Sequence, residues 1–158
     1  MGMIISTLGK LSAHTNPASI CEGEVESKEI IWNFTQHLAT PEQREQGVKD
    51  LPEELRQQLA EYLTFEDIPN DEDIQMVVGE ILCLISSIDT NVDDKIMIGG
   101  APFLMERLSA ALRHSKLRPV FAFSRRESVE QVMPDGSTRK TSVFRHLGFV
   151  EPKSPQQY

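Results

Sequence analysis

The chain has 158 residues, with 16 Lys and Arg against 24 Asp and Glu, and a formal net charge of −8. Its apolar fraction of 39% and charged fraction of 25% are typical of a globular protein, and its length favours one domain. Residues 1–100 carry six basic and 19 acidic side chains, whereas residues 101–158 carry ten basic and five acidic ones. The acidic overall balance excludes a general duplex-DNA binder, but the basic second part could hold an anion.

The cysteines and histidines limit the cofactors that the chain can hold. No pair among its two cysteines and four histidines has the spacing of metal ligands, so we expect no metal and no other cofactor. Cys21 and Cys83 are far apart, which favours a reducing, cytoplasmic environment. Cys83 lies in an apolar run and is expected in the core. No apolar run approaches the roughly 20 residues of a membrane span, so we expect no membrane contact.

Sustained hydrophobic patterns begin only after residue 28, so residues 1–28 predict a flexible N-terminal arm. Thr40, Pro41 and Gln43 are of the types found at a helix start, and Gly47 is typical of a helix end. The expected elements are then a strand over residues 30–35, a short helix ending at residue 47, a short strand over 48–51, a helix that begins at residue 52, and the longest helix over 71–87.

The second part of the chain predicts a strand, a helix and a long hairpin. An apolar strand over residues 95–98 ends at Gly99-Gly100, a helix begins at Pro102, and another strand starts at Val120. A strand, a helix and a strand of this length form a βαβ unit. The segment over residues 134–137 reads Pro-Asp-Gly-Ser between two strand-like runs, which indicates a hairpin that returns through residues 138–150.

These elements predict one three-layer, Rossmann-like α/β domain over residues 29–151, with a loose tail over residues 152–158. We expect a mainly parallel sheet with helices on both faces and a C-terminal antiparallel β-hairpin. Ligands of open α/β sheets bind beyond the carboxyl ends of the parallel strands, which is where we look for a site.

Two candidate segments follow the first and the third expected strands. Asn33, Thr35 and His37 form a polar cluster that can bind a base or a sugar, and a histidine can transfer a proton near pH 7. A loop histidine that only binds nearby backbone is an equally good interpretation. Gly99 and Gly100 allow a phosphate to approach the backbone and the next helix start, although a tight turn alone would also need glycine. They form neither a dinucleotide-binding nor a Walker motif, which disfavours NAD binding and ATP hydrolysis.

The third candidate segment is Ser124-Arg125-Arg126, at the point where an apolar strand continues into the hairpin. Symmetric pairing about Asp135-Gly136 would place Arg126 opposite Arg145, and Arg125 opposite His146. Because like charges that face each other are unfavourable, an anion between them is a reasonable occupant. The alternative is a solvated basic ribbon whose charge is balanced by nearby glutamates.

The segment Ile31-Trp32-Asn33-Phe34-Thr35-Gln36-His37, followed by Thr40-Pro41-Glu42-Gln43, resembles the opening of certain small CRISPR-associated proteins. In those proteins, an Asn-aromatic-Ser/Thr…His strand runs into a Thr-Pro-Glu-Gln helix start, and the later order of elements is also similar. The resemblance implies a CRISPR-associated Rossmann-like fold and a homodimer that binds a cyclic oligoadenylate messenger. In the ring-nuclease members it also implies cleavage of that messenger without a metal.

We therefore expect the protein to bind a phosphorylated, nucleotide-like ligand, with a cyclic oligoadenylate and its metal-independent cleavage as the specific form that the resemblance implies. His37 and Arg126 are the candidate catalytic residues. The candidate ligand-binding residues are Asn33, Thr35, Gly99, Gly100, Ser124, Arg125 and Arg145. The alternative is a non-catalytic interaction module that uses the acidic helices and the basic hairpin to bind a protein.

Overall fold

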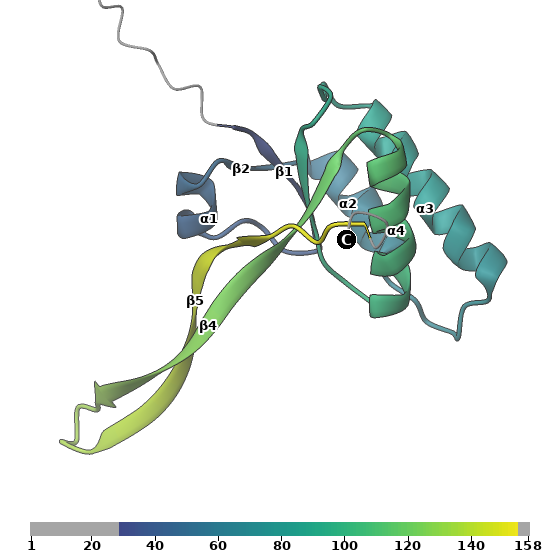
Figure 1. Ribbon diagram of the computed structural model, residues 1–158. Coiled ribbons are helices and arrows are strands. Elements are labelled where there is room, and N and C mark those ends of the chain that lie inside the picture. Colours follow the sequence, from purple (N-terminus) through teal and green to yellow (C-terminus); the bar gives the residue numbers. More distant parts are fainter. Residues whose placement is uncertain (1–28, 155–158) are drawn as a thin grey trace, which may run out of the picture.

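A computed structural model describes residues 29–154 of the chain (Figure 1). The arm expected over residues 1–28 and the end of the expected tail, residues 155–158, lie outside the described residues. The described elements are β1 (Ile31–Phe34), α1 (Pro41–Glu45), β2 (Val48–Asp50), α2 (Glu53–Tyr62), α3 (Asp71–Ser86), β3 (Lys95–Ile98), α4 (Pro102–His114), β4 (Arg118–Val132) and β5 (Thr138–Val150). Their order and types are those expected from the sequence.

The described strands form one five-stranded sheet in the order β2-β1-β3-β4-β5. The pairs β1–β2, β1–β3 and β3–β4 are parallel, whereas β4 and β5 are antiparallel. The antiparallel ladder is longer than the three parallel ladders together, because β4 and β5 continue far beyond the short strands β1, β2 and β3. The mixed α/β class is confirmed, but a mainly parallel sheet is wrong.

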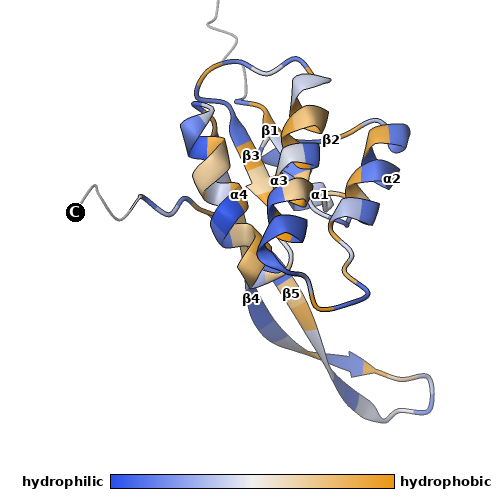
Figure 2. Ribbon diagram, turned by 90° about the vertical axis from the view of Figure 1, so that its right-hand side faces the viewer, coloured by the Kyte–Doolittle hydropathy of each residue, from blue (hydrophilic) through white to orange (hydrophobic). Residues whose placement is uncertain are grey.

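Helices α2, α3 and α4 cover one face of the sheet (Figure 1). Alternate residues of β1 and β3 point into this layer, because side chains alternate between the faces of a strand. The fully buried members of the core include Phe34, Leu59, Ile81, Ile96, Leu104, Leu108 and Leu112. Figure 2 shows the apolar strands under these helices. This core holds β1 and β3 side by side and thereby places their carboxyl ends together.

The second face of the sheet carries a smaller core and no comparable helical layer among the described residues. Ile31, Met97 and Val120 are buried there, with Phe149 of β5 packed against them. Helix α1 lies on this side, but it has five residues and none is buried. The expected full helical layer on both faces is therefore absent from the described part of the chain. Phe149 of β5 and the loop residue Ala39 pack on this face.

The turn of the β4–β5 hairpin differs from the expected one by one residue. The Gly136 N–H donates to the Met133 carbonyl, and Gly136 has a φ of +82°, so residues 134–136 form a three-residue loop. The predicted symmetry about Asp135-Gly136 is wrong, because the strands pair symmetrically about Asp135. Ser124 lies opposite His146, Arg125 opposite Arg145, and Arg126 opposite Phe144.

Two other expectations concern the surface of the described residues. Cys83 is exposed, so its expected place in the core is wrong. Ile81, Leu84 and Ile85 on the same helix are buried, and the helical spacing turns Cys83 away from them. Within residues 29–154, no helix has both the length and the apolar character needed to cross a membrane.

Candidate functional site

A cavity of about 420 Å³ lies at the carboxyl ends of β1 and β3. The loop after β1 forms one wall, the Gly99-Gly100 turn after β3 forms another, and β4 contributes Ala122. The lining residues are Thr35, Gln36, His37, Leu38, Thr40, Gln43, Met97, Gly99, Gly100 and Ala122. Two of the three predicted segments therefore meet at one cavity, whereas Ser124, Arg125 and Arg126 do not line it.

Among the described residues, the lining contains no Lys, Arg, Asp or Glu, and His37 is its one titratable side chain. Thr35, Gln36, Thr40 and Gln43 line the cavity with hydroxyl and amide groups that also form hydrogen bonds within the chain, beside the apolar surface of Met97. A pocket with this lining suits an uncharged, partly polar group such as a base or a sugar. A phosphate bound to the same ligand would need cations from outside the cavity.

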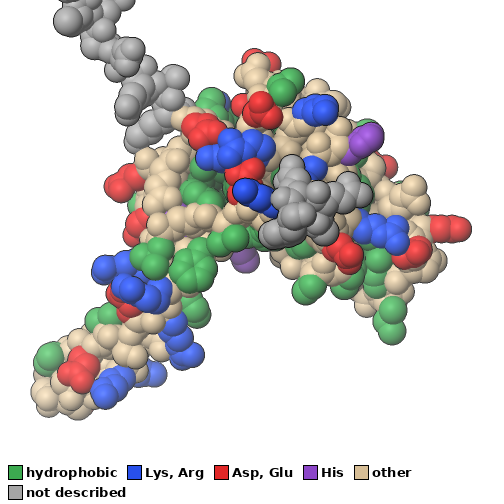
Figure 3. Space-filling model, viewed as in Figure 1, with side chains coloured by type: hydrophobic (Ala, Val, Ile, Leu, Met, Phe, Trp, Pro, Cys, Tyr) green, Lys and Arg blue, Asp and Glu red, His purple; other side chains and the backbone are tan. Residues whose placement is uncertain are grey.

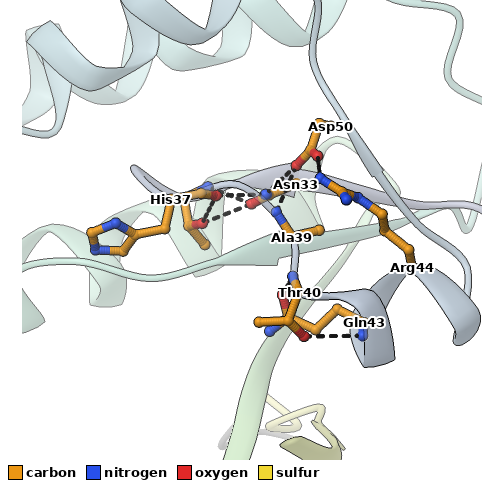
Figure 4. A network of polar contacts seen from close by, with 8 residues as sticks. Asn33, His37, Ala39, Thr40, Gln43, Arg44 and Asp50 are labelled. Carbon is orange, nitrogen blue, oxygen red and sulfur yellow. Dashed lines mark hydrogen bonds and ion pairs between the residues drawn. The ribbon is translucent and has the colours of Figure 1, made fainter.

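Asn33 is 3% exposed and joins β1 to the loop that forms the cavity wall (Figure 4). Its amide nitrogen donates to the His37 carbonyl (2.8 Å) and to Asp50 Oδ1 (2.7 Å). Its amide oxygen accepts from the Thr35 main-chain N–H (3.0 Å) and from the Thr35 hydroxyl (2.7 Å). All the polar capacity of this amide is thus used within the protein. Asn33 and the Thr35 hydroxyl shape the loop, and Thr35 also lines the cavity.

Asp50 is the second centre of this network, and the sequence pattern did not single it out. It lies beside Asn33 because β2 pairs with β1 in parallel register. Its carboxylate also accepts from the Ala39 N–H (2.9 Å) and pairs with Arg44 (3.1 Å). Partial burial alone would raise the pKa of Asp50, but the hydrogen bonds from Asn33, Ala39 and Arg44 outweigh it and lower that pKa. Asp50 is therefore ionised at neutral pH and fixes the start of α1.

The side chain of His37 is exposed, and Figure 4 shows its ring turned away from the Asn33 network. Only the main-chain carbonyl of His37 takes part in that network. The backbone is thus held in place while the ring stays available at the cavity. This arrangement agrees with a ligand-contacting histidine better than with one that binds nearby backbone through its ring.

Gly99 and Gly100 both line the cavity, and each has a steric reason to be glycine. A Cβ atom on Gly99 would lie 3.4 Å from the Thr35 methyl group, so a side chain there would crowd the opposite wall. Gly100 has a φ of +154°, a conformation that other residues rarely adopt. The glycines therefore keep the turn tight and the cavity open. Both interpretations of the pair, turn geometry and ligand approach, agree with this geometry.

Beyond the cavity, β4 and β5 form a two-stranded ribbon that projects from the body (Figure 1). Lys and Arg side chains gather along it (Figure 3). Side chains alternate between the two faces of the ribbon. At the register shift between Phe123 and Ser124 the unpaired residue lies on β5, so the alternation along β4 is not interrupted. We name the faces by their residues. The cavity face carries Ala122, Ser124, Arg126, Phe144 and His146, and the basic face carries Phe123, Arg125, Glu127, Val129, Arg139, Val143 and Arg145.

The predicted arginines are divided between these faces. Arg125 and Arg145 lie opposite each other on the basic face, where Glu127 pairs with both, at 2.8 and 3.4 Å. The hydrogen bond from Arg125, followed by the charge of Arg145, lowers the pKa of Glu127. The like charges are thus separated by a carboxylate of the chain. Arg126 lies on the cavity face and forms no ion pair within residues 29–154.

His146 connects β5 to α1 and is 7% exposed. Its Nε2 lies 3.1 Å from Gln46 Oε1, and its ring packs against Phe149 at 4.9 Å between centroids. Burial lowers the pKa of His146, although the charge of Glu42 acts in the opposite direction. This histidine holds the ribbon base against α1, so it contributes to the shape of the cavity face.

The described residues contain no group of three or more His, Cys, Asp or Glu side chains that could hold a metal ion. The arrangement in residues 29–154 is that of a mixed α/β protein with a mostly uncharged cavity at its strand ends and a basic ribbon beside it.

Residues 29–150 match the Uncharacterized protein MJ1673 family, and the chain belongs to that family. No curated protein and no solved structure matches the chain.

Proposed function

We propose that the protein binds an anionic, nucleotide-like ligand, with the base or sugar in the cavity and the phosphate on the cavity face of the ribbon. The observation that carries the proposal is the continuity between the two. Ala122 lines the cavity, and Ser124 and Arg126 follow it on the same face of β4.

The spacing of these residues suits a nucleotide. At 3.4 Å per residue, Ser124 lies roughly 7 Å and Arg126 roughly 14 Å along β4 from Ala122, which spans a nucleoside and its phosphate. Arg126 has no carboxylate partner within the described residues, so its guanidinium is available to a phosphate. Phe144 lies directly opposite Arg126 and is 74% exposed. An aromatic ring beside a cation can stack on a second base.

The resemblance to small CRISPR-associated proteins selects a cyclic oligoadenylate as the specific ligand, and antiviral defence as the setting. A ring of nucleotides would place one base in the cavity and its neighbour against Phe144. The same resemblance supports a homodimer, in which two cavity faces would surround one ring.

We further propose that His37 takes part in cleavage of such a ring. In a metal-independent reaction, the ribose 2′-hydroxyl attacks the adjacent phosphorus, the bond to the 5′-oxygen breaks, and a 2′,3′-cyclic phosphate forms. His37 would accept the 2′-hydroxyl proton or donate one to the leaving 5′-oxygen, and Arg126 would stabilise the charge that develops on the phosphate.

Isothermal titration at low salt tests binding, with cyclic tetra-adenylate, cyclic hexa-adenylate and AMP as ligands. We expect Ala122→Phe, which fills the cavity, and Arg126→Ala each to weaken binding by about tenfold or more. Arg139→Ala is the matched control with AMP as the ligand, because it removes an arginine from the basic face of the same ribbon and AMP occupies the cavity of one copy. Absence of binding by all three ligands, or equal losses of AMP affinity in Arg126→Ala and Arg139→Ala, would contradict the proposal.

Labelled ring incubated with the protein in EDTA tests cleavage. His37→Ala should abolish the product and leave ring affinity within about threefold. Undiminished cleavage by His37→Ala would remove His37 from the mechanism, and binding without turnover would leave a receptor rather than a nuclease.

A second candidate function is a protein-interaction module. It is favoured by the projecting ribbon, which carries half-exposed apolar residues on its basic face as well as its arginines.

A further inference from the structure

The basic face of the ribbon combines charge with exposed apolar surface. Phe123, Val129 and Val143 are 52%, 43% and 44% exposed and lie on the same face as Arg125, Arg139 and Arg145. Arg139 forms no ion pair within the described residues. A two-stranded ribbon has no core of its own and is marginally stable in water unless another surface packs on it. The basic face is therefore a surface that needs a partner.

A groove of complementary character lies between the end of α2 and the start of α3. Its cavity of about 340 Å³ is lined by apolar side chains that include Phe65, Ile68 and Met76. Ile68 is 98% exposed and Met76 is 62% exposed, which is unusual for large apolar side chains. Glu61, Glu66, Asp67 and Asp73 surround them. Glu66 and Asp67 are exposed and form no ion pair within residues 29–154.

We propose that the basic face of the ribbon docks in the acidic groove of a second copy of this chain, and that two copies exchange ribbons about a two-fold axis. The same chain carries both surfaces, which match in charge and in apolar content. The ribbon projects away from helices α2 and α3 of its own copy in both ribbon views (Figures 1 and 2). A second copy can therefore supply the groove, and reciprocal exchange closes the assembly at two.

The size of the contact suits a reversible dimer. From Ser124 to Val132 the ribbon is nine residues long, or roughly 30 Å, and its two strands are roughly 10 Å wide with their side chains. Each docked face then buries about 300 Å² on each side, so two reciprocal contacts bury about 1,200 Å² in total, the lower end of stable interfaces. This inference develops the interaction function proposed above and does not depend on the ligand, because the cavity face stays open.

Sedimentation of the full chain tests the inference with two charge-reversal variants. We expect a dimer for the wild type, and a dissociation constant raised about tenfold or more for Arg139→Glu and for Glu66→Lys/Asp67→Lys. A mixture of the two variants should dimerise again, because the glutamate-bearing ribbon meets the lysine-bearing groove and the unaltered ribbon meets the unaltered groove. Restoration on mixing distinguishes direct pairing from a general loss of structure.

Lys140→Glu is the matched control, since it reverses the neighbouring charge on the opposite face of the ribbon and should change dimerisation by less than about threefold. Ala122→Phe, which blocks the ligand cavity, should also leave the dimer intact, so failure of ligand binding and failure of docking are separable. A monomeric wild type at about 100 µM, a dimer unaffected by Arg139→Glu, or no restoration on mixing would overturn the inference. Each of these results would mean that the basic face does not bind the groove of a second copy of this chain.

Discussion

Replacing Asn33 with alanine removes the side chain that joins β1, β2 and the loop leading to α1. The substitution eliminates hydrogen bonds to the His37 carbonyl, to Asp50 and to both donors of Thr35. Asn33 is 3% exposed, while Thr35 and Asp50 are half-buried, so the partners left behind are only partly open to water. The loss should therefore exceed that of a surface hydrogen bond.

The bonds with neutral partners contribute about 1 kcal/mol each, and the bond to the ionised Asp50 contributes about 1.5–3 kcal/mol. Asp50 keeps its hydrogen bonds from Ala39 and Arg44, so the loss of the Asn33 bond leaves its carboxylate still partly bonded and costs less free energy. These terms sum to about 4.5–6 kcal/mol, and the bonds that Asp50 keeps reduce the loss, so we expect Asn33→Ala to lower the free energy of unfolding by about 4 kcal/mol, a large part of the about 5–15 kcal/mol of a typical domain. The melting temperature should fall by roughly 10–15 °C.

Urea unfolding followed by the fluorescence of Trp32, the chain's one tryptophan, measures this change directly at the adjacent residue. Thr35→Val is the control, because it keeps the side-chain shape and removes only the hydroxyl, at a cost of about 1 kcal/mol. If Asn33→Ala costs no more than Thr35→Val, the network does not hold the loop as argued.

Three further predictions concern pH and backbone conformation. The pKa of Asp50 is lowered in the folded protein, so its stabilisation is complete above about pH 4 and is lost as the pH falls through the lower folded value. Asp50→Asn should therefore weaken the dependence of the urea unfolding midpoint on pH in this acid range. The pKa of His146 is also lowered, so the unfolded chain takes up the proton first and the free energy of unfolding decreases as the pH falls below about 6.5. If a His146→Phe variant shows the same decrease, His146 is not its source. Gly136 has a φ of +82°, so Gly136→Ala should cost about 1 kcal/mol by thermal unfolding, and more than Gly148→Ala, which meets no atom within 4 Å and has no positive φ. Equal costs at the two glycines would mean that the turn relaxes.

The elements that the sequence predicted correctly are those with local signals. Thr40 caps α1 and Gln43 returns the bond, as their spacing predicts. Gly47 ends α1 with a φ of +101°, and a Cβ atom there would collide with the Glu29 carbonyl. The capping bonds and the positive φ of Gly47 are local and can be predicted from the sequence, whereas the contact with Glu29 spans 18 residues and depends on the tertiary structure.

The parts that were missed depend on contacts between distant segments. Asp50 could not be connected with Asn33 until β2 was known to lie beside β1. The packing on the second face of the sheet depends on how close β5 lies to α1. His146 of β5 contacts Gln46 at the end of α1, and these residues are 100 positions apart in the sequence. A cavity lies at the end of the sheet where the sequence predicts the candidate site, because the position of the strand ends follows from the parallel strands alone. The prediction of which side chains face the cavity would have required the register of the strands.

The register of one hairpin decides the chemistry on both faces of the ribbon. With a two-residue turn, Arg126 would lie opposite Arg145 on the cavity face, and Phe144 would lie on the basic face. The three-residue loop around Asp135 pairs Arg126 with Phe144 instead, and it leaves Arg145 with Arg125 around Glu127. Among residues 29–154, the cavity face thereby combines the Arg126 guanidinium, which forms no ion pair, with the exposed Phe144 ring, and the proposal of a nucleotide-like ligand rests on this combination. Arg125, Arg139 and Arg145 lie on the opposite face, where a protein surface rather than a small anion is the better match.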